Sequence, residues 1–318
     1  MTTEAMPTTP SDTSLPKVSV VICSYSVERV NDVYQAVESL LGQVYPPCEV
    51  IVSVDHNQEL FDTLKGRLPA SVALTLSTEA PGLSGTRNHA IMTAIGDVIA
   101  FMDDDAVAKD DWLEQLVYHY SNRSVLAVGG KIIPVWESAR PFWFPQELDW
   151  TIGGSYKGMA DASGPVRNLW GGNMSFRREV FQQVGPFDTR LGRTGSSGEG
   201  EDTEFCMRIA NSMSEATIMY EPKAIMYHKV PWQRARLKYV LRRAFDGGRS
   251  LGRIKRKQVA QSDVPLSTER VYLRYLFTQA IWERIGRLYK PQTIAQIGTI
   301  MLSVAVTGSG FLVGRARG

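Results

Sequence analysis

The stretch Val98-Ile99-Ala100-Phe101-Met102-Asp103-Asp104-Asp105 decides the fold, because an apolar run of strand length ends there in three consecutive acids. Adjacent carboxylates repel one another, and each stays hydrated unless a cation neutralises it. In open α/β sheets, ligands bind beyond the carboxyl ends of the strands, and hard oxygen ligands suit Mg²⁺ or Mn²⁺. The stretch therefore predicts a metal site at a strand end. The alternative is a solvated acidic turn before the helix predicted over residues 109–120.

The residues upstream of this stretch alternate between predicted strands and predicted helices. The strands are expected at residues 17–23, 49–54 and 72–76, and the helices at residues 30–44, 58–67 and 88–95. Strands that are nearly continuous in apolar residues are typical of parallel sheets covered on both faces. The alternation therefore predicts an α/β fold with a doubly wound, mostly parallel central sheet.

Composition limits the possible partners and compartments. The chain has 318 residues, of which 43% are hydrophobic and 21% charged, enough for one large domain and a smaller appendage. A net charge of +2 gives no general attraction to nucleic acid, so no nucleic-acid partner is expected. Three widely spaced cysteines form neither a disulfide framework nor a zinc pattern, which is typical of a reducing cytoplasm. No signal-peptide pattern opens the chain, and residues 1–16 are predicted to be a disordered tail.

Two common nucleotide-binding motifs are missing. No Gly-x-Gly-x-x-Gly follows the first predicted strand and no Walker lysine loop occurs, which argues against a dinucleotide oxidoreductase and a P-loop phosphotransferase. Other residues are candidates for ligand binding. Asp55 ends the second strand, and Arg87 lies in a small-residue loop before a helix whose N-terminus could hold phosphate. The alternatives are a helix cap for Asp55 and a surface side chain for Arg87.

Four blocks in this order resemble the nucleotide-sugar half of family 2 glycosyltransferases, which have the GT-A fold. They are Cys23-Ser24-Tyr25, Asp55, Gly82-Leu83-Ser84-Gly85-Thr86-Arg87-Asn88 and Asp103-Asp104-Asp105. The resemblance implies that Asp55 and Asp104 hold the uracil and the ribose. It also implies donor contacts for Ser24, Tyr25, Arg87 and Asp103, and a divalent metal, Mg²⁺ or Mn²⁺, on Asp105.

The second half is expected to bind the acceptor. Trp170-Gly171-Gly172-Asn173 resembles the segment before the acceptor helix of the family, which implies acceptor-side roles for Trp170, Gly172 and Asn173. Glu201 and Asp202 open a helix predicted over residues 203–210, and the resemblance makes Asp202 the general base, with Glu201 beside it. An acid at a helix start can also be only a cap. His228, after a strand predicted at residues 224–227, is a candidate metal ligand or a packing residue.

Three further features of this half leave alternatives open. Strands are expected at residues 125–132 and 216–220. The aromatic segment 136–150 is either a core plug or a platform for a sugar or lipid. The glycine-rich loop at residues 192–200 is able to close over a substrate.

The runs at residues 129–134, 167–178 and 198–204 resemble glucuronosyltransferases that act on glucosyl-dolichyl phosphate. This resemblance implies a UDP-sugar donor, UDP-glucuronate above all, and a lipid-linked or glycan hydroxyl as acceptor, joined in one inverting displacement. Two rival functions are a nucleotidyltransferase that makes the sugar nucleotide and a non-catalytic scaffold at a membrane.

The C-terminal part changes in character. Residues 234–257 form a basic stretch broken only by Asp246, residues 267–289 have an amphipathic pattern, and residues 291–314 carry no charge. About twenty helical residues cross a bilayer core, and basic residues attract anionic lipid. We predict a GT-A domain at 17–230, a basic and amphipathic helical region at 231–290, and a membrane-associating segment at 291–318 that spans the bilayer or lies on it. The positive charge on its N-terminal side indicates the cytoplasmic face of the cell membrane. The alternative is a helix packed on the domain or on a second subunit of a homo-oligomer.

Overall fold

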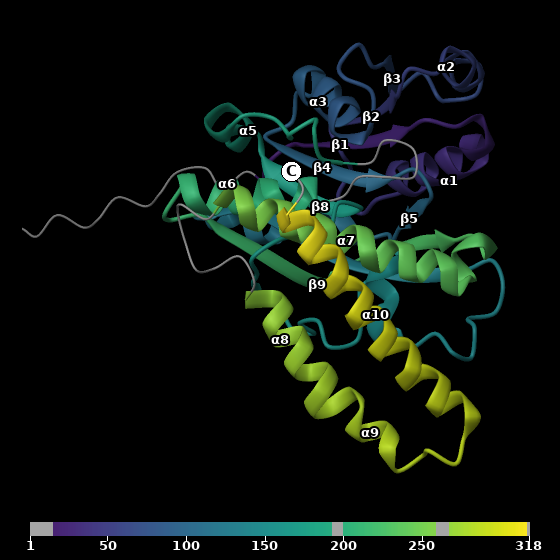
Figure 1. Ribbon diagram of the computed structural model, residues 1–318. Coiled ribbons are helices and arrows are strands. Elements are labelled where there is room, and N and C mark those ends of the chain that lie inside the picture. Colours follow the sequence, from purple (N-terminus) through teal and green to yellow (C-terminus); the bar gives the residue numbers. More distant parts are fainter. Residues whose placement is uncertain (1–14, 193–199, 259–266, 317–318) are drawn as a thin grey trace, which may run out of the picture.

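The computed structural model describes residues 15–192, 200–258 and 267–316 (Figure 1). One mixed sheet forms its centre, in the order β3-β2-β1-β4-β8-β6-β9-β5, and β7 pairs with β9. The strands are β1 (Val18–Ser24), β2 (Glu49–Val54), β3 (Val72–Leu76), β4 (Val98–Asp103), β5 (Ala106–Ala108), β6 (Val125–Trp136), β7 (Gly164–Pro165), β8 (Asn173–Arg177) and β9 (Thr217–Val230). The first four strands are parallel, whereas β8 runs antiparallel to both β4 and β6. The predicted α/β class is confirmed, and the sheet is mixed rather than mostly parallel, because β5, β7 and β8 each pair antiparallel with their neighbours.

Alternating side chains bury both faces of the sheet. Val20 and Ile22 of β1 pack on one face against α1 (Val30–Leu41), α2 (Gln58–Lys65) and α4 (Trp112–Tyr118). Val21 of β1 and Phe101 of β4 pack on the other face, under α3 (Leu83–Thr93), α5 (Arg178–Val184) and α6 (Glu201–Ser212). Successive strand residues point to opposite faces, so the continuous apolar runs supply two cores at once.

Two element boundaries differ from those predicted. Helix α3 begins at Leu83, five residues before the expected start, after Gly82 with φ +110°. A Cβ at Gly85 would lie 1.8 Å from the Ala80 carbonyl oxygen, so only glycine permits this early start. The two short strands expected at residues 216–220 and 224–227 are one strand, β9, whose register against β6 shifts between Glu221 and Ile225. Pro222 lies within this shift, because it has no N–H to donate to the ladder.

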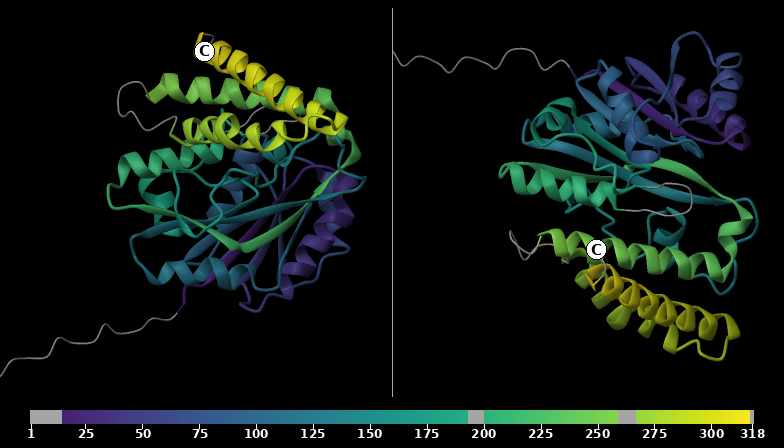
Figure 2. Two further views of the ribbon diagram at one scale, coloured as in Figure 1. Left: turned by 90° about the horizontal axis from the view of Figure 1, so that it is seen from below. Right: turned by 45° about the horizontal axis from the view of Figure 1, so that its top comes forward.

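The C-terminal helices form a separate layer against one side of the α/β domain (Figure 2). The layer contains α7 (Leu237–Gln258), α8 (Ser267–Tyr275), a π-helical turn (Leu276–Ala280), α9 (Trp282–Ile285) and α10 (Pro291–Ala316). The amphipathic segment is thus interrupted by the π-helical turn. Helix α10 has the length and apolar composition of a membrane span, with 28% of its most apolar window buried.

Helix α10 packs along its length on the rest of the layer. A Cβ at Gly248 of α7 would lie 2.0 Å from the Thr307 carbonyl oxygen of α10, and a Cβ at Gly310 would lie 2.1 Å from the Phe245 carbonyl oxygen of α7. Gly252 and Gly314 make equally close contacts one turn further on. The two backbones therefore touch, as in small-residue helix pairs. The N-terminal half of α10 packs through Ile300 on the π-helical turn.

Candidate active site

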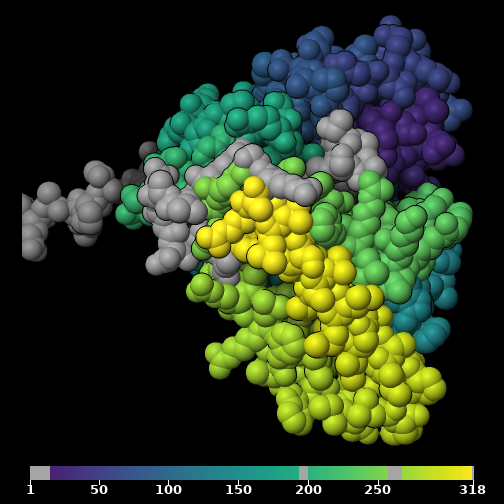
Figure 3. Space-filling model, in the orientation of Figure 1, coloured from purple at the N-terminus to yellow at the C-terminus, as the bar shows by residue number. Residues whose placement is uncertain are grey.

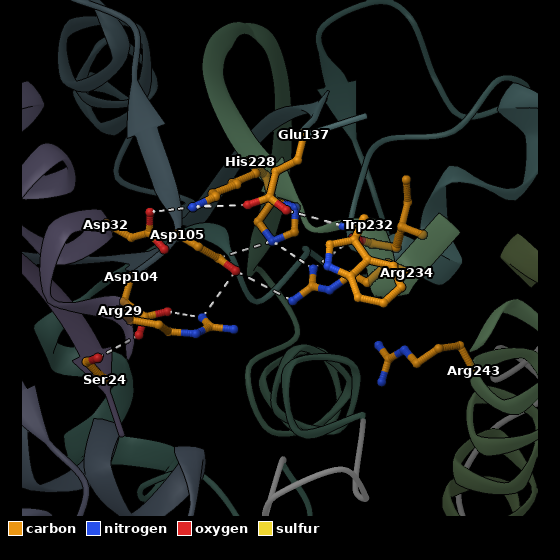
Figure 4. Close-up of polar contacts among 12 residues, drawn as sticks. Ser24, Arg29, Asp32, Asp104, Asp105, Glu137, His228, Trp232, Arg234 and Arg243 are labelled. Atoms are coloured by element: carbon orange, nitrogen blue, oxygen red, sulfur yellow. Dashed lines mark hydrogen bonds and ion pairs between the residues drawn. The ribbon is translucent and has the colours of Figure 1, made fainter. Parts of the chain in front are cut away.

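The acidic triplet lies where β1 and β4 end side by side. Figure 4 shows Asp104 and Asp105 of this triplet with Ser24 and Arg29 beside them. The Ser24 hydroxyl donates to Oδ2 of Asp104 at 2.6 Å. The Arg29 guanidinium pairs with Asp104, and its Nη1 lies 3.1 Å from Oδ2 of Asp105. Burial raises the pKa of Asp104 to about 6, against the opposing effect of Arg29. One oxygen of Asp104 is thus held by the Ser24 hydroxyl and the other by the Arg29 guanidinium.

Strand β9 brings His228 to this edge, because Ala106 of β5 pairs with His228 in antiparallel register. His228 Nε2 lies 3.2 Å from Oδ1 of Asp105 and 3.2 Å from Nη1 of Arg234. Arg234 Nη2 lies 3.5 Å from the other oxygen of Asp105. Burial alone would raise the pKa of Asp105, but His228, Arg29 and Arg234 together hold it well below its usual range. Asp105 therefore stays ionised.

The side chains of Asp103, Asp105 and His228 fit a divalent metal. Each offers one ligand atom, and these atoms lie within 4.8 Å of one another. Nδ1 of His228 is buried and has no hydrogen-bond partner among the residues described. Two carboxylate oxygens and one imidazole nitrogen are a ligand set that Mn²⁺ or Mg²⁺ accepts. The geometry groups Asp103 with the metal candidates, although the sequence had suggested a donor contact for it.

The other expected donor residues surround the same strand ends. The Asp55 N–H donates to the Ser24 carbonyl oxygen at 2.8 Å, so the ends of β1 and β2 are joined. Oδ2 of Asp55 accepts from the Gly82 N–H at 3.0 Å, before α3. The Tyr25 side chain is 53% exposed, and the Arg29 guanidinium lies 5.3 Å from its ring centroid. Tyr25 is therefore available to stack on a ligand, whereas both Asp55 oxygens are engaged by the chain itself, Oδ2 by the Gly82 N–H and Oδ1 by Nδ1 of His56 at 2.8 Å.

Asp202 is held by a chain of contacts that begins at Arg87 on α3. Arg87 is buried, and its guanidinium donates to Oε1 of Glu201 and to the Gly171 carbonyl oxygen, both at 2.8 Å. The Gly171 N–H donates to Oδ2 of Asp202 at 2.9 Å, and the Thr203 N–H donates to Oδ1 at 2.6 Å. Burial and the neighbouring Glu201 raise the pKa of Asp202 to about 6. Arg87 and Glu201 thus position Asp202, and Arg87 is not a free surface side chain.

The expected acceptor-side residues divide into two groups. Trp170 and Gly172 line the cavity beside Asp202. A Cβ at Gly172 would lie 2.5 Å from Oδ2 of Asp103, so this glycine lets the backbone approach the acid. Asn173 is fully buried instead: its amide donates to the Lys131 and Ala224 carbonyl oxygens and accepts from the Trp112 indole. We therefore assign Asn173 a structural role.

The aromatic segment at residues 136–150 serves mainly as a plug. Phe144 is buried in a small core with Leu148, and Trp136 packs against it. Trp150 also lines the cavity, and its indole donates to the Tyr272 hydroxyl at 3.3 Å. Residues 193–199 of the glycine-rich loop predicted at 192–200 lie outside the described residues, so its closure over a substrate stays a prediction.

A cavity of about 520 Å³ joins these groups to the C-terminal layer. Its wall includes Asp103, Gly172 and Asp202, and it continues along α7, α8 and α10. Arg29 and Arg234 both form ion pairs with Asp105. The sequence alone did not identify either of them as a site residue. No local pattern marks Arg29, and Arg234 was one of many basic residues in a charged stretch.

The fold is the GT-A fold of glycosyltransferases, as predicted. Residues 19–185 match the description "Glycosyl transferase family 2", and the chain belongs to this family. It is 34% identical to a glucosyl-dolichyl phosphate glucuronosyltransferase from Haloferax volcanii, over 94% of this chain and 96% of that protein.

Two solved structures share the fold. A mannosyltransferase from Pyrobaculum calidifontis, in complex with GDP-mannose and Mn²⁺, aligns with a TM-score of 0.56 at 19% identity. The alignment covers 99% of this chain and 85% of that chain. GalNAc-T7 with UDP, GalNAc and Mn²⁺ aligns with a TM-score of 0.51 at 17% identity, over 85% of this chain and 57% of that chain.

Proposed function

We propose that the protein transfers glucuronate from UDP-glucuronate to a hydroxyl of a lipid-linked glucose. The observation that carries the proposal is the position of Asp202 in one cavity with Asp103, the acid that ends β4. The 34% identical relative, whose name states this reaction type, supports the choice of donor and acceptor. Family membership favours sugar transfer over nucleotidyl transfer or a non-catalytic scaffold.

Asp202 is proposed to act as the general base in a single inverting displacement. Its carboxylate takes the proton of the attacking hydroxyl, and the hydroxyl oxygen bonds to the anomeric carbon on the face opposite the leaving group. The bond between that carbon and the diphosphate oxygen breaks, and UDP leaves with the electron pair. Two backbone N–H groups, of Gly171 and Thr203, hold the carboxylate in one orientation for this task.

Asp103, Asp105 and His228 are proposed to hold Mg²⁺ or Mn²⁺, which would neutralise charge on the leaving diphosphate. Arg29 and Arg234 keep Asp105 ionised and oriented. The remaining donor-side residues are proposed to bind the nucleotide, with Tyr25 as the exposed aromatic surface and Asp104 fixed by its neighbours. These residues are Ser24, Tyr25, Asp55 and Asp104.

We further propose that the protein works at the cytoplasmic face of an anionic membrane. The length and apolar character of α10 and the lipid-linked substrate in the name of the relative support membrane association. Exposed basic side chains on α8 and after α9 include Arg270, Arg274, Arg287 and Lys290. Each basic group near an anionic surface contributes about 1 kcal/mol. A homo-oligomer stays a prediction.

The test replaces Asp202 by asparagine and measures UDP release with UDP-glucuronate and a glucosyl-phosphate polyprenol. Removal of a general base lowers kcat by roughly 10²- to 10⁴-fold, whereas UDP affinity, measured by calorimetry, is expected to stay within a factor of about two. Glu204→Gln is the matched control, because Glu204 lies on the same helix and pairs with Arg208. Retained turnover in Asp202→Asn contradicts the assigned base. Turnover with another UDP-sugar and none with UDP-glucuronate contradicts the donor.

A further inference from the structure

The cavity has two chemically different ends. One end is polar and contains Arg87, Asp103 and Asp202. The other end is enclosed by the C-terminal layer, where Leu251, Ile254, Leu273, Val304 and Phe311 form an apolar stretch of the wall and Ser250, Ser303 and Thr307 lie beside them. A hydrocarbon chain suits the apolar end.

The apolar end reaches the molecular surface between α8 and α10. Leu273 of α8 lines the cavity and is still 38% exposed. Gly308 of α10 also lines the cavity and is exposed. A hydrocarbon chain in the cavity can therefore extend to the molecular surface between α8 and α10.

The surface around this opening suits an anionic bilayer. Val271 and Leu312, on the two flanking helices, are 65% and 67% exposed. Exposed Arg270 and Arg274 of α8 stand among these apolar groups, the combination found in helices that lie in a membrane interface. In the space-filling view, α10 runs as a continuous band over the outside of this layer (Figure 3).

The contact between α7 and α10 limits the orientation that α10 can take at a bilayer. Charged residues such as Lys238, Arg242, Asp246 and Arg253 occur throughout α7, so α7 cannot enter the hydrocarbon core. The backbones of the two helices touch at Gly248 and at Gly310 of α10. This contact favours an orientation in which α10 lies along the membrane surface.

We propose that the apolar end of the cavity holds the hydrocarbon chain of the lipid-linked acceptor, which enters from the bilayer between α8 and α10. The inference rests on the proposed function, because it assigns a place to the lipid of that acceptor. The glucosyl group then lies toward Asp202, and the chain leads away from the polar end toward the membrane.

The experiment compares Gly308→Leu with Gly298→Leu. A Cβ at either glycine meets no atom within 4 Å, both are exposed positions of α10, and only Gly308 lines the cavity. Transfer is measured with glucosyl phosphates that carry a short isoprenyl chain or a long polyprenyl chain. Gly308→Leu is expected to raise KM for the long-chain acceptor by about tenfold, since the new side chain takes space from the lipid. It leaves KM for the short-chain acceptor and UDP affinity unchanged, and Gly298→Leu behaves like the unmodified protein.

A second readout separates this inference from the proposed function. A long-chain polyprenyl phosphate with a photoreactive group in the chain is expected to label the peptide that contains Leu251 or Phe311. If neither peptide is labelled, the apolar end of the cavity does not bind the lipid, even when transfer proceeds. The same conclusion follows if Gly308→Leu leaves KM for the long-chain acceptor unchanged. Labelling without transfer to either acceptor supports lipid binding at the apolar end of the cavity and overturns the proposed sugar transfer.

Discussion

The donor end of the candidate site and the C-terminal layer are built by opposite means. At the donor end, Arg29 from the segment after β1, His228 of β9 and Arg234 from the segment after β9 converge on Asp105. At the C-terminal layer, four glycines allow two helix backbones to touch, and no charge is needed. The first arrangement depends on electrostatics and the second on volume. Changes of charge should therefore affect the donor end and changes of size the layer.

Asp105→Asn should produce the largest effect, because it removes a ligand from the candidate metal site and the carboxylate that Arg234 pairs with, while Arg29 keeps Asp104. Metal stabilisation of a leaving group is worth several kcal/mol, so turnover should fall by about 10³-fold or more. UDP affinity, followed by calorimetry, should weaken to the value obtained with a chelator. Asp32→Asn is the control, since Asp32 pairs with Lys229 nearby. A UDP affinity indifferent to both chelator and Asp105→Asn would rule out the metal site.

Acid should reduce turnover through Asp202 before it unfolds the protein. With a pKa of about 6, Asp202 is about nine-tenths ionised at pH 7 and about one-eleventh at pH 5, so kcat/KM should fall roughly tenfold over this interval. The pKa is raised by burial and Glu201, against Arg87. Because the folded state then binds the proton more tightly than the unfolded state does, this group makes folding more favourable as the pH falls from 6 toward 4. A pH–rate profile with thermal melts at each pH checks both statements, and a flat profile contradicts the assignment of Asp202.

Gly310→Leu should give the smallest effect on chemistry and a clear effect on stability. Its Cβ would lie 2.1 Å from the Phe245 carbonyl oxygen, so α10 must move away from α7. Overpacking of this kind costs about 1–3 kcal/mol in the free energy of unfolding. Denaturant unfolding measures that loss, and calorimetry should find UDP affinity unchanged. Gly298→Leu, in open space on the same helix, should unfold like the unmodified protein. Equal stability of the two variants would show that the helices do not depend on their close contact.

The difference between the donor end and the C-terminal layer also explains how far the sequence was informative. Asp103, the last residue of β4, is followed directly by Asp104 and Asp105, so their site is visible as a local motif, and the alternating strands and helices predict the parallel half of the sheet. Arg29 and Arg234 reach Asp105 only through folding, and no local pattern identifies such partners. The structural role of Asn173 was equally hidden, because its partners come from three distant segments. The glycines of α7 and α10 are visible in the sequence, yet only the structure shows that they face each other.

Gly172 constrains how this chain can vary over time. The residue offers no functional group, yet any larger replacement would push Asp103 out of line with Asp105 and His228. A substitution at Gly172 is therefore expected to disturb the candidate metal site, although glycine itself has no functional group. The absence of a side chain at Gly172 leaves the space that the Asp103 carboxylate occupies.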